Sequence, residues 1–214
     1  MIRLICVERN NKKLLKFKEK KEFIEHTGVN KHFLDLSRKK STSDLCLVAA
    51  NKIINSLNWK KTDIRFLLFV SQTRDFMMPN TACIIQKKLG LDKNILAYDI
   101  PLGCSGFVFG LYTAYLISKN MKSKGLLLSG GMSSRFIDLK DKRMFGLFGD
   151  AGTAVAINYK KVLNNISHFS FGTDGGGYRN LIYNSSGMEQ IKNKKFLEMN
   201  GAKIFEFALN ELPS

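Results

Sequence analysis

The segment from Asp99 to Gly106, with the sequence DIPLGCSG, holds the residues best suited to chemistry. A strand-like apolar run ends there, a turn with Pro and Gly follows, and Cys104 stands where a helix is expected to begin. A thiol in that place faces unpaired backbone N–H groups and the positive end of the helix dipole, which favour the nucleophilic thiolate. Gly103 leaves room for a substrate carbonyl. On spacing alone, a buried unreactive cysteine remains the alternative.

The other cysteines lack this setting. Cys46 and Cys83 fall within predicted helices and are expected to be packing residues, no two cysteines have C-x-x-C spacing, and the three histidines do not cluster with them. We therefore expect no metal site and no disulfide framework, which fits a reducing, cytoplasmic compartment. The glycine-rich stretches 149–154 and 175–177 lack complete phosphate-loop or dinucleotide fingerprints, so no cofactor is expected.

Strand-like apolar runs alternate with helical patterns between residues 65 and 159. This order predicts an α/β fold with a mostly parallel sheet flanked by helices. We expect strands at 1–7, 65–71, 95–100, 125–129 and 152–159, with a further one at 166–171. We expect helices at 11–25, 44–58, 79–89 and 105–119, and one that starts near Gly201 within 196–212. Ser43 is the expected N-cap of the second helix.

Composition and charge limit the classes of partner. The chain has 214 residues with 34 Lys+Arg and 18 Asp+Glu, a formal net charge of +16. This excess favours an anionic partner, although a general bias in composition explains it equally well. The basic stretch 12–21 offers no aromatic platform, so we expect no nucleic-acid partner. Residues 100–118 carry no charge, but Pro101 and Gly103 leave about 14 residues for a helix, too few to span a membrane.

Several motifs resemble, in order and spacing, those of β-ketoacyl-[acyl carrier protein] synthase III, a family of the thiolase-like superfamily. The resemblance runs from about residue 15 to residue 212. Its motifs are YDIPLGCSGFVFGLYTA around Cys104, LFGDAGTAVAI at 147–157, FGTDGGGYRNLI at 171–182 and LEMNGAKIFEFALNEL at 197–212. The resemblance implies a thiolase-like α/β fold and an acyltransferase of fatty acid biosynthesis. In this family a cysteine takes an acyl group from a thioester, and a decarboxylated malonyl-carrier thioester then attacks it.

The resemblance also implies roles for individual residues. Cys104 takes the place of the nucleophile, and its backbone N–H would help to form the oxyanion hole. Phe148 and Leu181 would line the acyl pocket, and Met78 would reach the pocket of the partner subunit in a homodimer. For these three, ordinary core packing is the alternative. Asp150, in a Gly-flanked loop, is expected to be structural and to accept backbone N–H bonds.

The resemblance implies an acyl carrier protein and an acyl thioester as partners. The family's coenzyme A site has a Trp and an Arg before a T-G-I turn, whereas Glu22 and His26 stand before Thr27-Gly28 here. Because stacking on an adenine is lost at Glu22, a coenzyme A donor is in doubt and a carrier-bound donor is favoured.

Three segments follow from the alignment of motifs. Residues 1–170 match the N-terminal thiolase-like half, 171–195 an active-site loop region, and 196–214 the opening helix of the C-terminal half. The family's catalytic His and Asn lie beyond that helix, so the second half of the duplicated fold is expected to be missing and condensation to be incomplete. The chain would be a truncated enzyme or one piece of a split enzyme. A non-catalytic module that binds an acyl carrier protein through the basic N-terminal region is the alternative.

Overall fold

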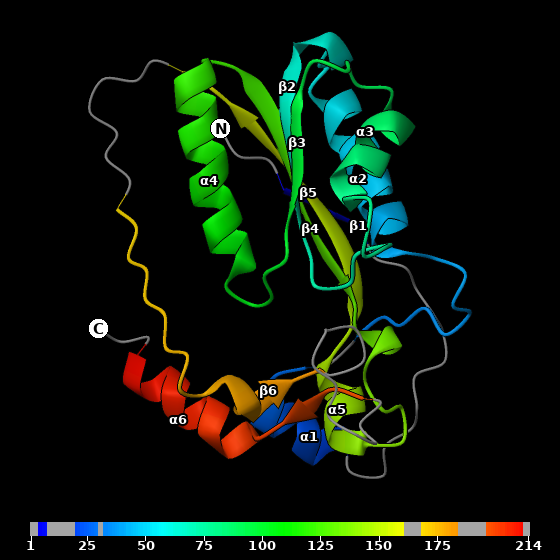
Figure 1. The fold of residues 1–214 in the computed structure, drawn as a ribbon. Coiled ribbons are helices and arrows are strands. Elements are labelled where there is room, and N and C mark those ends of the chain that lie inside the picture. Colours follow the sequence, from blue (N-terminus) through cyan, green and yellow to red (C-terminus); the bar gives the residue numbers. More distant parts are fainter. Residues whose placement is uncertain (1–3, 8–19, 30–31, 161–167, 184–195, 212–214) are drawn as a thin grey trace.

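A five-stranded sheet with helices on both faces forms the larger part of the computed structural model (Figure 1). The structure describes residues 4–7, 20–29, 32–160, 168–183 and 196–211. The strands are β1 (Leu4–Val7), β2 (Ile64–Val70), β3 (Leu96–Ile100), β4 (Lys124–Met132), β5 (Asp150–Asn158), β6 (Leu181–Ile182) and β7 (Glu198–Met199). The α-helices are α1 (Lys20–Thr27), α2 (Thr42–Ser56), α3 (Thr81–Leu89), α4 (Gly106–Met121), α5 (Lys142–Leu147) and α6 (Gly201–Glu211).

The sheet has the strand order β1-β5-β4-β2-β3 and is mixed. Strands β3, β2 and β4 are parallel, as the sequence predicts, whereas β5 runs antiparallel to both β4 and β1. The direction changes because the chain turns back after β4 through a short 3₁₀ turn and α5, without the crossover over the sheet that a parallel neighbour requires. Helices α2 and α3 cover one face and α4 the other, while β6, β7, α1, α5 and α6 form a second layer beyond one end of the sheet (Figure 1).

Strand β2 is buried on both faces, which explains its continuous apolar sequence. Alternate residues of β2 enter two separate clusters. Leu67 and Phe69 pack in the cluster that includes residues of α2 and α3, and Phe66 and Leu68 pack in the one that includes Ala114 of α4. The central strand therefore fixes the helices of both faces.

Most predicted elements are confirmed, but some caps and bounds differ. The N-cap of α2 is Ser41 rather than Ser43, because Ser41 and Asp44 form a reciprocal capping box, while the Ser43 hydroxyl donates to Asp75. Helix α3 begins at Thr81, two residues after Pro79. Of the predicted helix 11–25, residues 20–25 lie in α1 and the others lie outside the described residues.

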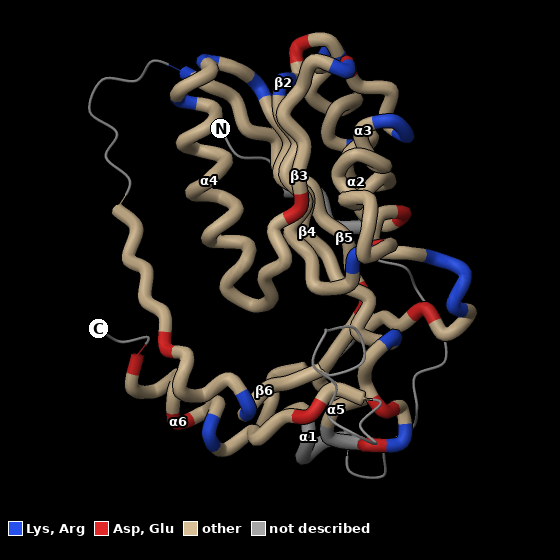
Figure 2. The backbone as a smooth tube through the Cα atoms, viewed as in Figure 1, with Lys and Arg blue, Asp and Glu red and all other residues tan. Residues whose placement is uncertain are grey.

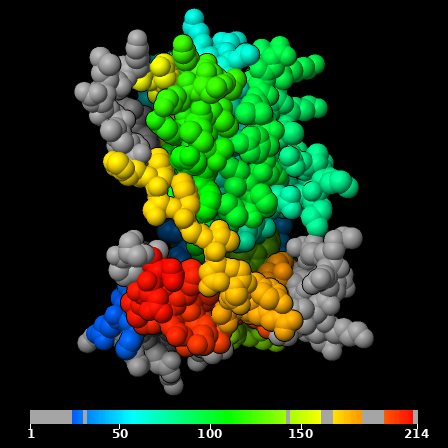
Figure 3. All heavy atoms as spheres, turned by 60° about the vertical axis from the view of Figure 1, so that its left-hand side comes forward, coloured from blue at the N-terminus to red at the C-terminus, as the bar shows by residue number. Residues whose placement is uncertain are grey.

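The strand predicted at 166–171 is wrong for its described part. Residues 168–171 form no strand, since the Phe169 and Phe171 rings pack against α4 instead of entering the sheet. The Phe171 ring lies 4.7 Å from that of Phe109, and the Phe169 ring lies 5.0 Å from that of Tyr112, centroid to centroid. Figure 3 shows this segment running along the side of α4 towards the layer that contains α6. Residues 166 and 167 lie outside the described residues.

Two glycines set the distance between α4 and the sheet. A Cβ atom on Gly106 would lie 2.7 Å from Val70 Cγ1, and one on Gly110 would lie 2.7 Å from Val70 Cγ2 and 2.9 Å from Leu127 Cδ1. At such distances the Val70 and Leu127 side chains would have to shift to admit a Cβ atom. The spacing of four residues puts both glycines on the same helix face, so α4 lies directly on β2 and β4.

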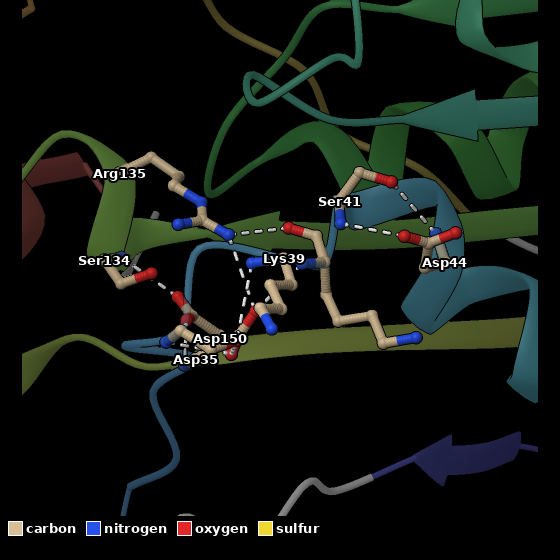
Figure 4. Close-up of polar contacts among 9 residues, drawn as sticks. Asp35, Lys39, Ser41, Asp44, Ser134, Arg135 and Asp150 are labelled. Atoms are coloured by element: carbon tan, nitrogen blue, oxygen red, sulfur yellow. Dashed lines mark hydrogen bonds and ion pairs between the residues drawn. The ribbon is translucent and has the colours of Figure 1, made fainter.

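Asp150 is structural, as the sequence predicts. Its carboxylate is buried and accepts the backbone N–H of Asp35 at 2.7 Å and that of Ser134 at 2.9 Å (Figure 4). One side chain at the start of β5 thus holds both the segment before α2 and the turn after β4.

Asp35 continues this network. Its carboxylate accepts hydrogen bonds from the Ser37 side chain and the Lys40 backbone N–H and lies 3.5 Å from the Arg135 guanidinium. Burial by itself raises the pKa of the Asp35 carboxyl, but the hydrogen bonds and the Arg135 charge outweigh burial, so the net pKa lies below its usual value.

No helix in the described part of the chain is long and apolar enough to cross a membrane. The uncharged stretch 100–118 instead contains the last residue of strand β3, a turn and the first thirteen residues of α4, from Gly106 to Ser118.

Substituting Gly110 tests the close approach of α4. We expect Gly110→Ala to lower the free energy of unfolding by about 1–3 kcal/mol, because overpacking against Val70 and Leu127 outweighs the ~1 kcal/mol helix-propensity gain of alanine. Urea unfolding followed by circular dichroism measures the change. Gly201→Ala is the matched control, since no heavy atom lies within 4 Å of its Cβ position. Equal stability of Gly110→Ala and the native chain would contradict the packing described.

Acid unfolding tests the Asp35 network. Because the pKa of Asp35 is lower in the folded chain than in the unfolded chain, the unfolded chain binds more protons as the pH falls. Asp35 therefore stabilises the fold above the unfolded pKa of about 4, and this contribution is lost as the pH falls through the lower folded pKa. We expect the unfolding free energy of Asp35→Asn to fall less steeply than that of the native chain between about pH 5 and 3. Parallel curves for the two proteins would refute this role.

Candidate active site

The parallel strands bring the predicted site residues to one end of the sheet. The carboxyl ends of β2, β3 and β4 meet at the same edge, and β5, running the opposite way, begins there. The loops after β2 and β3 carry Met78 and Cys104, and Phe148 lies just before β5. Leu181 lies in β6, in the layer that faces this end of the sheet (Figure 1).

Cys104 lies in the turn between β3 and α4, two residues before the helix begins, and it is exposed. The turn closes through a hydrogen bond of 2.8 Å from the Gly106 N–H to the Gly103 carbonyl, and the Ser105 carbonyl accepts the N–H groups of Val108 and Phe109. In the described part of the chain, the N–H of Cys104 itself has no acceptor. The thiol and this N–H are therefore open to a ligand at the N-terminal end of a 16-residue helix.

Asp99 fixes the strand that leads into this turn. Its carboxylate accepts the backbone N–H groups of Thr81 at 2.8 Å and Ala82 at 2.7 Å, the first two residues of α3. These bonds satisfy two donors that the helix leaves unpaired and tie β3 to α3. This function of Asp99 was not predicted from the sequence, although a carboxylate at the end of a strand is a fitting acceptor.

The loop after β2 lies against the turn that carries Cys104. A Cβ atom on Gly103 would lie 2.5 Å from Gln72 Oε1, so the Gln72 amide occupies the space that any other residue at position 103 would need. Gly103 was expected to leave room for a substrate, but in the structure the Gln72 side chain takes this room.

The other three predicted residues differ in exposure. Met78 is 83% exposed and Leu181 is 40% exposed, whereas Phe148 is half-buried. High exposure of Met78 does not fit packing within this chain. The structure brings all four residues to one end of the sheet, and no hydrogen bond or ring contact among the described residues joins any of them to another. Their substrate roles stay predictions.

Burial shifts the pKa values of two further groups, His32 and Cys46. Burial lowers the pKa of the His32 imidazole, and the charge of Asp150 offsets this lowering only in part. The His32 ring packs edge-on against the Phe145 ring, with 5.3 Å between the ring centroids. Burial raises the pKa of the Cys46 thiol to about 12, which suits the predicted packing role. The same prediction is wrong for Cys83, which is exposed on α3. Among the described residues, no three His, Cys, Asp or Glu side chains are placed to hold a metal ion.

Comparison with known proteins agrees with the motifs. Residues 98–175, which contain the turn with Cys104 and all of α4, β4 and β5, match the family model of 3-oxoacyl-[acyl-carrier-protein (ACP)] synthase III. A β-ketoacyl-[acyl-carrier-protein] synthase III of Fusobacterium nucleatum is 33% identical over 185 residues, which are 83% of this chain and 56% of that protein.

Solved structures show the same fold. A 2.1 Å crystal structure of a 3-oxoacyl-(acyl-carrier-protein) synthase III has a TM-score of 0.84 at 29% identity, over 90% of this chain and 62% of that one. The 3-oxoacyl-(acyl-carrier protein) synthase of Burkholderia xenovorans has a TM-score of 0.79 at 34% identity, over 90% of this chain and 58% of that one. The predicted thiolase-like α/β fold is confirmed.

The chain spans little more than half the length of the relatives it matches. Over that length the sequence motifs, the family model and the fold agree. By sequence and by fold, this chain is therefore a relative of the 3-oxoacyl-[acyl-carrier-protein] synthase III proteins.

Proposed function

We propose that this chain is an acyl-thioester transferase of the ketoacyl synthase III type, with Cys104 as the nucleophile. The observation that carries the proposal is the exposed thiol at the N-terminal end of α4, within the segment that matches the family model. The Cys104 thiolate would attack the carbonyl carbon of an acyl thioester, the donor thiol would leave, and the acyl group would remain on Cys104 as a new thioester.

The turn suits the charge that develops in this step. The free N–H of Cys104 and the N-terminal end of α4 would stabilise the oxyanion of the tetrahedral intermediate. The close packing of Gly106 and Gly110 on the sheet would hold these donors in place without movement during the reaction. We propose that Phe148 and Leu181 line the acyl pocket.

Condensation would require further groups. In the complete reaction, a malonyl-carrier thioester loses CO2 and the resulting carbanion attacks the acyl-enzyme. None of His26, His32 and His168 stands at the family's catalytic position, so we propose none of them as the decarboxylating group. We propose that the chain carries the acylation step and is catalytically incomplete in condensation. The division into 1–170, 171–195 and 196–214 is proposed on the same basis.

The partners follow from the surface and the relatives. We propose an acyl carrier protein as donor rather than coenzyme A, because Glu22 and His26 stand before the Thr27-Gly28 turn. The net charge of +16 suits an acidic carrier protein in the cytoplasm. A homodimer is also proposed, since β3 is an edge strand and the exposed Met78 is free to reach a second subunit.

Intact mass spectrometry tests the nucleophile. After incubation with an acyl-carrier thioester, we expect the chain to gain the mass of one acyl group, located on Cys104 by peptide mapping. The adduct should disappear in Cys104→Ala and persist in Cys83→Ala, which removes the other exposed described cysteine. In a parallel incubation, we expect acyl-coenzyme A to give a slower reaction.

The alternative is a module that binds a carrier protein without chemistry. Carrier binding that survives Cys104→Ala and weakens with salt, together with no adduct from any acyl thioester, would favour this module and reject the enzyme.

A further inference from the structure

A hollow of about 660 Å³ lies beside the nucleophile turn and has no assigned function. It is formed by the segment before α2, the loop after β2, the turn after β4 and Tyr183. Gln72 lines the hollow and also touches the space at Gly103, so the hollow and the nucleophile turn share one side chain. Its volume is in the range of sites for small ligands, which is 300–1,000 Å³.

The hollow is strongly basic. Four of its lining residues are cations and one is an anion: Arg38, Lys40, Arg74 and Arg135 against Asp75. A concave surface with walls of low dielectric concentrates such a field. Figure 2 shows basic residues on the loop that precedes α2.

Few of these cations are paired. In the part of the chain that the structure describes, Arg38, Lys40 and Arg74 have no carboxylate within ion-pair distance. The Arg74 guanidinium has only a 3.7 Å contact with the Met77 sulfur. Asp75 is engaged elsewhere, because it accepts both the N–H and the hydroxyl of Ser43. The hollow therefore holds an excess of positive charge.

Arg135 is held in place at the wall. One of its nitrogens, Nη2, donates to the Lys40 carbonyl at 2.6 Å and faces Asp35 (Figure 4). Its second terminal nitrogen, Nη1, is buried and has no hydrogen-bond partner among the described residues. The guanidinium is thus oriented before any ligand arrives.

Aromatic and thioether groups complete the wall. Phe76 is 59% exposed and Met77 is 57% exposed, although both line the hollow. The rings of Phe136 and Tyr183, also in the lining, contact one another at 5.5 Å. An inorganic ion would leave these apolar surfaces in water.

We propose that this hollow binds a small organic phosphate that carries an aromatic or apolar group. Three unpaired cations suit the doubly charged phosphate better than a single carboxylate, and Arg matches the geometry of phosphate oxygens. The concave shape favours a small molecule over the flat surface of an acidic protein. This site does not depend on the reaction proposed for Cys104.

Isothermal titration calorimetry of the 214-residue chain with phenyl phosphate tests the proposal. We expect saturable binding of one molecule per chain, at least ~10-fold tighter than that of inorganic phosphate because the ring buries apolar surface. Arg74→Ala and Lys40→Ala should each weaken binding by ~5-fold or more because each removes a charge-assisted contact. Lys52→Ala, which removes an exposed cation of α2 outside the hollow, should leave the affinity unchanged.

The controls separate a site from general attraction of anions. Equal weakening in Lys52→Ala would overturn the proposal, as would an absence of saturable binding. Equal affinity for phenyl phosphate and inorganic phosphate would overturn the claim that the ligand carries an aromatic or apolar group. Thermal unfolding of each variant establishes that a lost affinity reports the hollow and not the fold.

Discussion

The absence of side chains at two positions of α4 sets the geometry on which the candidate site depends. Gly106 and Gly110 bring the helix against Val70 and Leu127, at a distance that a larger residue could reach only if these side chains shifted. Because the helix begins at Gly106, this contact fixes the place of its N-terminal end and of Cys104 before it. The backbone donors there are preorganised by packing in the core rather than by the turn alone.

Two carboxylates, one buried and one half-buried, fix the loops next to this helix end. Asp99 joins β3 to the start of α3, and Asp150 joins the start of β5 to the segments around Asp35 and Ser134. Each carboxylate accepts two backbone N–H groups, and such charge-assisted bonds are stronger than neutral ones. The loops at the carboxyl end of the sheet are thereby held from both sides, and the basic hollow forms between them.

Local sequence predicted what depends on local chemistry. The apolar run of β2, the αL glycine that ends α3 and the position of Cys104 before a helix were all readable. The antiparallel direction of β5 could not be predicted in this way, because it depends on how the chain returns after β4. The contact of Asp99 with Thr81 joins residues 18 positions apart, and the hollow combines cations from three distant segments. Ser41 was a recoverable N-cap, since Asp44 follows it at capping-box spacing.

The rate at which Cys104 reacts with iodoacetamide tests most directly whether the fold presents an activated nucleophile, without any knowledge of the acyl donor. Cys83 is the internal reference, since it is also exposed and lies within a helix instead of before one. We predict that Cys104 reacts at least ~10-fold faster than Cys83 at neutral pH, and that the ratio falls towards one in urea as the helix N-terminus is lost. Equal rates in the folded chain would contradict the account.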